Sequence, residues 1–129
     1  EAKIASSKID GLLKNAQEIG SLRVVSGALD GAAADELRKT ADTIKNNNED
    51  VIAVLAAVND GKLTFCVSCG KAAVAKGAHA GNLVREIAKI AGGNGGGKPD
   101  LAMAGGKDVS KVNEALGAVE NAVRAQIGE

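Results

Sequence analysis

The sequence predicts a single mixed α/β domain (α+β type), in which helices flank a small β-sheet built on a central hairpin. Three observations support this fold class. The length of 129 residues fits one domain, segments with helical spacing alternate with short apolar runs, and no repeat or linker divides the main body. Only one residue, Phe65, is aromatic, so the core must consist of Val, Ile, Leu and Ala side chains.

The first part of the chain predicts a helix, a strand and a second helix. Residues 3–19 carry apolar side chains at helical spacing and end before Gly20, which favours a helix. Residues 22–29 hold two valines between polar neighbours and favour a strand. Residues 32–47 favour another helix, with acidic residues in its first turn and a lysine in its last, as the helix dipole prefers.

The rest of the chain predicts a hairpin and two helices separated by a loop. Residues 51–58, VIAVLAAV, contain no polar side chain, as a central strand covered on both faces requires. The Asp-Gly turn that follows indicates a hairpin with a partner strand at 63–69. Residues 80–91 and 110–126 show the apolar stripes of amphipathic helices. Residues 92–108, GGNGGGKPDLAMAGGKD, are expected to form a long loop.

The N-terminal helix is expected to stand apart from the main domain. The chain begins at Glu1 without a Met, and helical periodicity starts at once, which is typical of a piece of a longer protein. Residues 1–20 are therefore assigned to a helix that continues from an upstream linker, and residues 21–129 to the domain itself. No apolar run reaches the roughly 18 residues of a membrane span, and there is no signal-peptide pattern. We expect a cytoplasmic protein without a membrane partner.

The net charge is zero, but basic residues concentrate in the middle of the chain. Residues 61–111 contain eight basic and three acidic side chains, whereas the segments before and after them have net charges of −3 and −2. The overall field would not draw this protein to nucleic acid or membrane. The basic middle is either a local surface for anions or a solvated face with its counter-charges elsewhere.

The glycine-rich segment is the strongest candidate for a binding site. Seven of the 17 glycines lie between Gly92 and Gly106, and consecutive amides in such a loop form a concave nest for phosphate oxygens. Lys98 and Lys107 lie inside the segment, and the next helix, capped by Ser110, would add its positive N-terminus. A flexible connection is the alternative, although the apolar LAMA run between the glycine clusters favours a segment folded onto the body.

Catalytic and metal-binding motifs are not convincing. The GxxxxGK pattern that begins at Gly92 continues with Pro99, where a P-loop needs Ser or Thr to bind Mg²⁺. Cys66 and Cys69 would point to opposite faces of a strand, so we expect buried apolar side chains rather than a zinc site. His79 is expected to cap the helix that follows or to lie on the surface. We therefore expect no metal, cofactor or catalytic residue in this chain.

The segment 87–108 resembles the end of bacterial alanyl-tRNA synthetases. It reads IAKIAGGNGGGKPDLAMAGGKD, and those enzymes finish with a glycine-rich run, a basic residue, Pro-Asp, an Ala-x-Ala-Gly-Gly signature and one last helix. The hairpin VIAVLAAVNDGKLTF and the helix from Ala80 fit as well, so the resemblance covers nearly the whole chain. It implies a tRNA-binding domain of the DHH-associated type. Such a domain contacts the outer corner of tRNA and supports aminoacylation and editing carried out by absent domains.

The resemblance also implies which residues meet the RNA. Position 98 holds Lys where Arg is frequent in the family, which loses a bidentate phosphate contact. The implied partners are tRNA, specifically that for alanine, and the other domains of the parent enzyme, an ATP-dependent ligase. The residues implied in nucleic-acid binding are Gly95, Gly96, Gly97, Lys98, Ala104, Gly105, Gly106, Lys107 and Lys71.

Two other functions stay open at this point. The same domain type resembles the substrate-binding domain of DHH phosphoesterases and RecJ-like nucleases, which holds a nucleotide or nucleic acid near metals of another domain. Alternatively, the first and last helices, both amphipathic, would join two copies of the chain, so that the segment serves as an oligomerisation module and the partner is a homodimer. None of these functions makes the fragment itself an enzyme.

Overall fold

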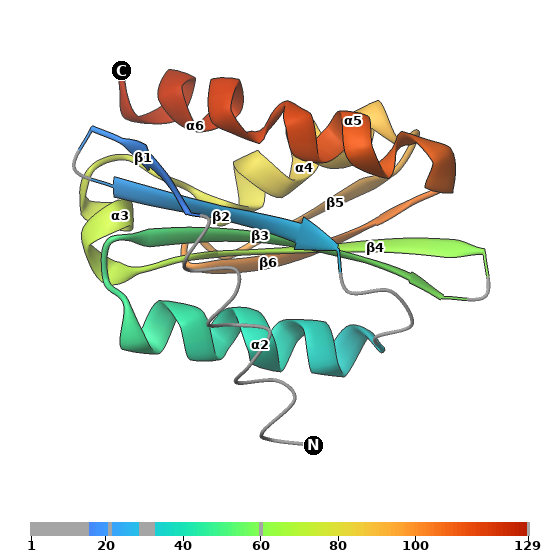
Figure 1. The fold of residues 1–129 in the computed structure, drawn as a ribbon, viewed down its shortest axis with the longest axis horizontal. Coiled ribbons are helices and arrows are strands. Elements are labelled where there is room, and N and C mark those ends of the chain that lie inside the picture. The colour runs from blue at the N-terminus through green and yellow to red at the C-terminus, as the bar shows by residue number, and fades with distance from the viewer. Residues whose placement is uncertain (1–15, 21, 29–32, 60, 129) are drawn as a thin grey trace.

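A computed structural model describes residues 16–20, 22–28, 33–59 and 61–128. They form a six-stranded sheet with helices on both faces (Figure 1). The strands are β1 (Gln17–Ile19), β2 (Leu22–Ala28), β3 (Val51–Asn59), β4 (Lys62–Cys69), β5 (Asn94–Gly97) and β6 (Leu101–Gly106). The helices are α2 (Ala34–Asn47), α3 (Lys71–Ala75), α4 (Ala80–Ile90), the 3-10 helix η1 (Val109–Lys111), α5 (Val112–Gly117) and α6 (Val119–Ile127).

The strand order across the sheet is β1-β2-β3-β4-β6-β5. β2 and β3 run parallel, since α2 carries the chain from the end of one to the start of the other. All other neighbouring strands are antiparallel. β3 is buried from Val51 to Ala57, and Gly61, with φ of 75°, lies in the turn to β4. The apolar run and the Asp-Gly turn therefore predicted the central hairpin correctly.

Each face of the sheet packs against its own helices. On one face, α2 buries Leu37, Ala41 and Ile44 completely, and the other face is covered by α4, α5 and α6 (Figure 1). Cys66 belongs to the core under α2, whereas Cys69 belongs to the core on the other face. The two thiols therefore point to opposite sides of β4, as the strand spacing predicted.

The end of the expected N-terminal helix is a strand. Residues 1–15 of that helix lie outside the described residues. Residues 17–19 form β1, which pairs with β2 through Ile19 and Leu22, and Gly20 adopts a φ of 61° in the turn between them. Pairing with the sheet and complete burial of Ile19 outweigh the local helical pattern at these residues.

The prediction of a loop at 92–108 is wrong, because most of this segment is a β-hairpin. β6 pairs with β4, and β5 pairs with β6 at the edge of the sheet. The apolar LAMA run forms most of β6 and buries Ala102 and Ala104, so the segment is folded onto the body as expected. Glycine is depleted in strands in general. The glycine-rich composition of β5 therefore did not predict a strand.

The expected final helix has a different start and a break. It begins as η1, and Ala118 separates α5 from α6. Asp108, rather than Ser110, caps it, because its carboxylate accepts a hydrogen bond from the backbone N–H of Ser110 at 3.0 Å. The short helix α3 was not expected. Among the helices of the described residues, none combines the length and the apolar character needed to cross a bilayer.

Candidate nucleic-acid interface

The glycines of the β5–β6 hairpin fall into two groups, because alternate residues of a strand face opposite sides. Gly95 and Gly97 face α4 and lie beside two alanines of β6. A Cβ atom on Gly95 would stand 2.2 Å from the Cβ of Ala104, and one on Gly97 would stand 2.8 Å from the Cβ of Ala102. Packing alone therefore requires glycine at these two positions.

The helix α4 packs so closely against β5 that there is no room for a side chain at Gly81. A Cβ on Gly81 would stand 2.6 Å from the carbonyl oxygen of Gly97. The N–H of Gly81 donates to the carbonyl of Lys98 at 3.2 Å, and the N–H of Gly93 donates to the carbonyl of Ala88 at 2.8 Å. These bonds join the two ends of α4 to the two ends of β5. Part of the glycine-rich signature thus follows from packing within the fold.

The other side of the hairpin is open at two glycines. Among the described residues, a Cβ on Gly96 would meet one atom within 4 Å, the Nη2 of Arg85 at 3.6 Å. A Cβ on Gly105 would likewise meet one atom of the described residues, the carbonyl oxygen of Leu63 at 3.8 Å. Met103, which pairs with Gly96, is half-buried on the same face. Packing does not demand glycine at positions 96 and 105, and the bare backbone there can be approached from outside.

The hairpin does not form the concave nest of amides expected for a loop. Of the described glycines from 92 to 106, only Gly92 has a positive φ, 71°. A nest needs successive N–H groups that converge, whereas those of an extended strand point alternately to its two edges. The residues Gly95, Gly96 and Gly97 therefore form an extended strand, and their N–H groups do not converge on one phosphate.

The two lysines of the segment lie at opposite ends of the hairpin. Lys98 follows β5 in the turn, where its N–H donates to the carbonyl of Leu101 at 3.1 Å. Lys107 follows β6, and its N–H donates to the carbonyl of Ala91 at 3.0 Å. The six residues of β6 separate them, which amounts to about 20 Å at 3.3 Å per residue. The sequence interpretation placed both lysines in one cradle, and the structure places them in two separate positions.

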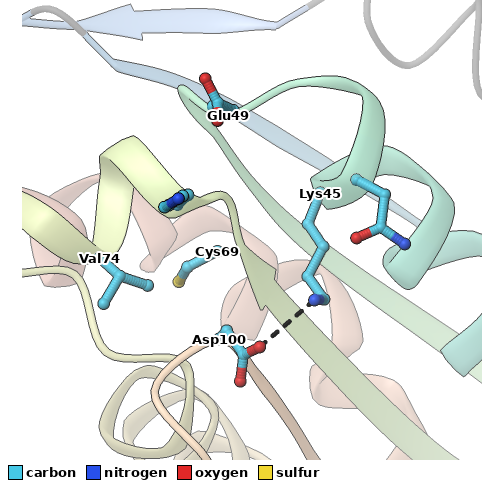
Figure 2. Close-up of a pocket in the computed structure, with 7 residues that line it drawn as sticks. Lys45, Glu49, Cys69, Val74 and Asp100 are labelled. Carbon is cyan, nitrogen blue, oxygen red and sulfur yellow. Dashed lines mark hydrogen bonds and ion pairs between the residues drawn. The ribbon is translucent and has the colours of Figure 1, made fainter.

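Lys71, on α3, lies near the Lys98 end of the hairpin. It lines a pocket of about 400 Å³ between α2, α3 and the turn that contains Asp100 (Figure 2). The other lysine of this pocket, Lys45, lies 3.3 Å from Asp100 and 3.5 Å from Asp42. Figure 2 shows the ammonium of Lys45 directed at Asp100, so its charge is neutralised within the protein. Lys71 is the lysine of this pocket that is left for an external anion.

Most basic side chains of residues 61–111 have no acidic partner within the part of the chain that the structure describes. The ion pairs found there are Arg23–Asp50, Lys45–Asp42, Lys45–Asp100, Lys111–Glu114 and Arg124–Glu120. The exposed basic residues of 61–111 outside these pairs are Lys62, Lys71, Lys76, Arg85, Lys89, Lys98 and Lys107. Their positive charge is available to anions in solution.

The cysteines and the histidine have structural roles. Burial raises the pKa of both Cys66 and Cys69 to about 12, so the thiols stay protonated at neutral pH. His79 caps α4, because its Nδ1 accepts a hydrogen bond from the N–H of Asn82 at 3.1 Å. This confirms the capping role predicted from its position. No three His, Cys, Asp or Glu side chains of the described residues gather as a metal site would need.

Arg85 is the basic residue that the sequence interpretation missed. It lies on the exposed side of α4, and its guanidinium stands beside the open face of Gly96. The periodicity of 80–91 identified the helix but could not reveal that β5 runs beneath it. The signal becomes visible only once the glycine-rich segment is recognised as a strand.

The sequence matches a family model and several alanine–tRNA ligases. Residues 21–125 match the DHHA1 domain. The alanine–tRNA ligases of Acetivibrio thermocellus and Clostridioides difficile are 44% and 39% identical to the chain over 126 and 127 residues. In both comparisons the alignment covers 98% of this chain and 14% of the relative, so the chain spans a small part of those proteins.

Similar solved structures extend the comparison. The C-Ala domain from Aquifex aeolicus alanyl-tRNA synthetase matches with a TM-score of 0.78 and 26% identity, over 84% of this chain and 97% of that domain. An exopolyphosphatase-related protein from Bacteroides fragilis shares the fold, with a TM-score of 0.60 and 11% identity over 96% of this chain and 35% of that protein. Since the family match covers most of the chain and the mixed α/β fold agrees with it, the chain belongs to the DHHA1 domain family.

Proposed function

We propose that this chain is the tRNA-binding C-terminal domain of an alanine–tRNA ligase and that the β5–β6 hairpin is its RNA contact surface. The observation that carries the proposal is that Lys98 and Lys107, at the two ends of the hairpin, are exposed and form no ion pair with another described residue. The similarity to alanine–tRNA ligases over nearly the whole chain supports RNA as the anion that these lysines meet.

The proposed contact depends on the RNA backbone rather than on stacking of bases. The only aromatic side chain, Phe65, is completely buried, so no surface ring is available for a base to stack on. Lysines about 20 Å apart reach phosphates that are not neighbours along one strand. Contacts of this kind read the shape of a folded RNA through phosphates and 2′-hydroxyl groups. The bare backbone at Gly96 and Gly105 lets the RNA come close between the two lysines.

In this proposal the domain binds and does not react. It holds the outer corner of the tRNA for alanine while aminoacylation and editing take place in other domains of an ATP-dependent parent ligase. Lys71 adds a third phosphate contact beyond the turn of the hairpin. No cofactor is needed for this role.

Titration of the chain with tRNA for alanine at several salt concentrations tests the proposal. Each of the variants Lys98→Ala, Lys107→Ala and Lys71→Ala should reduce the slope of log K against log salt by about 0.7 to 0.9, which corresponds to one phosphate contact. Lys39→Ala is the matched control, because Lys39 is an exposed lysine on α2 that takes part in no ion pair of the described residues. A chain that does not bind tRNA, or three variants with the slope of the unchanged chain, would contradict the proposal.

A further inference from the structure

We infer that Arg85 forms, with Gly96 and Lys98, a separate phosphate-binding site at the outer edge of β5. The inference rests on the proposed function, because the phosphate would belong to the bound RNA. It adds a residue of α4 to a surface that the sequence assigns only to the glycine-rich segment and to Lys71.

The position of Arg85 follows from the way α4 lies over β5. Hydrogen bonds join Gly81 to Lys98 at one end and Ala88 to Gly93 at the other. Arg85 lies midway between these two connections. β5 is the edge strand of the sheet, so a long side chain from α4 can pass around it to the opposite face. The 3.6 Å distance between the Nη2 of Arg85 and the Cβ position of Gly96 places the guanidinium beside Gly96.

The charge of Arg85 is available to a ligand. Arg85 is exposed, and no carboxylate of the described residues forms an ion pair with it. Gly96 presents no side chain on this face, so space next to the guanidinium stays open. An unpaired arginine beside bare backbone offers parallel N–H donors in the geometry that a phosphate accepts.

Lys98 lies next to Gly96 and Arg85 and completes the site. It follows Gly96 by two residues, at the start of the turn after β5, so its side chain starts about 7 Å from Gly96. A lysine acts on a phosphate as a point charge, whereas a guanidinium fixes the orientation of the oxygens. In this chain Arg85 therefore supplies the planar, bidentate contact that Lys98 cannot.

A double-mutant cycle on tRNA binding tests the inference. At low salt, Arg85→Ala should weaken the affinity roughly tenfold and lower the salt slope by about one phosphate contact. Arg85→Lys should restore the slope but only part of the affinity. Because Arg85 and Lys98 would share one phosphate, the double variant Arg85→Ala/Lys98→Ala should lose less than the product of the two single effects. With Lys107→Ala, about 20 Å away, the effects should multiply.

The controls separate this site from the fold and from the proposed function. Each variant should keep the melting temperature of the unchanged chain, since Arg85 and Lys98 are exposed. If Lys98→Ala weakens binding while Arg85→Ala does not, the site is wrong and the tRNA-binding role stands. Independent effects of Arg85 and Lys98 would also overturn the shared site. If the unchanged chain does not bind tRNA at all, the proposed function itself fails.

Discussion

At the scale of single residues, two adjacent glycines of β5 should differ in the stability that each loses on substitution by alanine. Gly95→Ala would place a Cβ 2.2 Å from the Cβ of Ala104 and 2.5 Å from its Cα, so we expect a loss of about 1–3 kcal/mol in the free energy of unfolding. A Cβ on Gly96 would make an ordinary contact with the Nη2 of Arg85 at 3.6 Å, so Gly96→Ala should change this free energy by less than about 0.5 kcal/mol. Urea denaturation followed by circular dichroism measures both. Equal effects of the two variants would mean that Gly95 is not packed against Ala104 of β6 as described.

The two thiols provide a second residue-scale prediction. Cys66 and Cys69 are buried, and burial raises the pKa of each to about 12. Since the thiolate is the reactive form, the native protein at pH 8 should react with a thiol reagent far more slowly than the protein in denaturant. Counting modified thiols over time with Ellman's reagent, with and without urea, checks this. Rapid reaction of one thiol in the folded protein would show that its strand face is open.

At the scale of elements, Gln126 joins the last helix to the start of α4. Its side-chain oxygen accepts from the N–H of His79 at 3.0 Å, and its amide donates to the carbonyl of His79 at 3.1 Å. Gln126→Ala removes both hydrogen bonds and should destabilise the domain by about 1–3 kcal/mol. Gln126→Glu keeps the acceptor but sets a carboxylate oxygen against the carbonyl of His79, so it should also destabilise the domain. Thermal denaturation should give both variants a lower melting temperature than the unchanged chain, and an unchanged Gln126→Ala variant would contradict the contact.

The ion pair between β2 and the start of β3 predicts a dependence on pH. The Arg23 guanidinium hydrogen-bonds the Asp50 carboxylate at 3.0 Å and lowers its pKa below the ordinary 3.8. A carboxyl whose pKa is lowered by folding stabilises the protein above the unfolded pKa and loses this effect as pH falls through the folded one. Both side chains are more than a third exposed, so the pair should contribute at most about 1 kcal/mol.

The measurement compares the unchanged chain with Asp50→Asn from pH 7 down to pH 2.5. The difference in melting temperature should be largest near neutrality and shrink below about pH 3.8. A difference that stays constant over the whole range would show that the carboxylate charge plays no part.

The elements that the sequence predicted are those whose apolar pattern repeats locally. The spacing of apolar side chains predicted the positions of α2, β2, β3, β4 and α4. The Asp-Gly pair in the sequence predicted the central hairpin. β1 and β5 could not be predicted in this way. Ile19 is buried where it pairs with a strand that follows it, and Gly95 is a strand residue through its pairing with Ala104 of β6. The strands β1 and β5 depend on tertiary contacts, which a local sequence pattern does not indicate.

At the scale of the whole molecule, the same contacts explain why the candidate site was only partly predictable. Lys98 and Lys107 were identified from their place in the glycine-rich segment, and both are exposed. Their separation and the approach of Arg85 to Gly96 became evident only when the segment proved to be a hairpin. The positive charge of residues 61–111 is therefore spread over several strands, helices and turns and does not converge on one loop.

The most direct test of the central claim is a map of amide chemical shifts as tRNA for alanine is added to the isotope-labelled chain. If the hairpin is the RNA contact surface, the largest changes should fall on Gly96, Lys98, Gly105 and Lys107, with small changes around Lys39 on α2. Changes concentrated on α2 or α6, with the hairpin unaffected, would contradict the account.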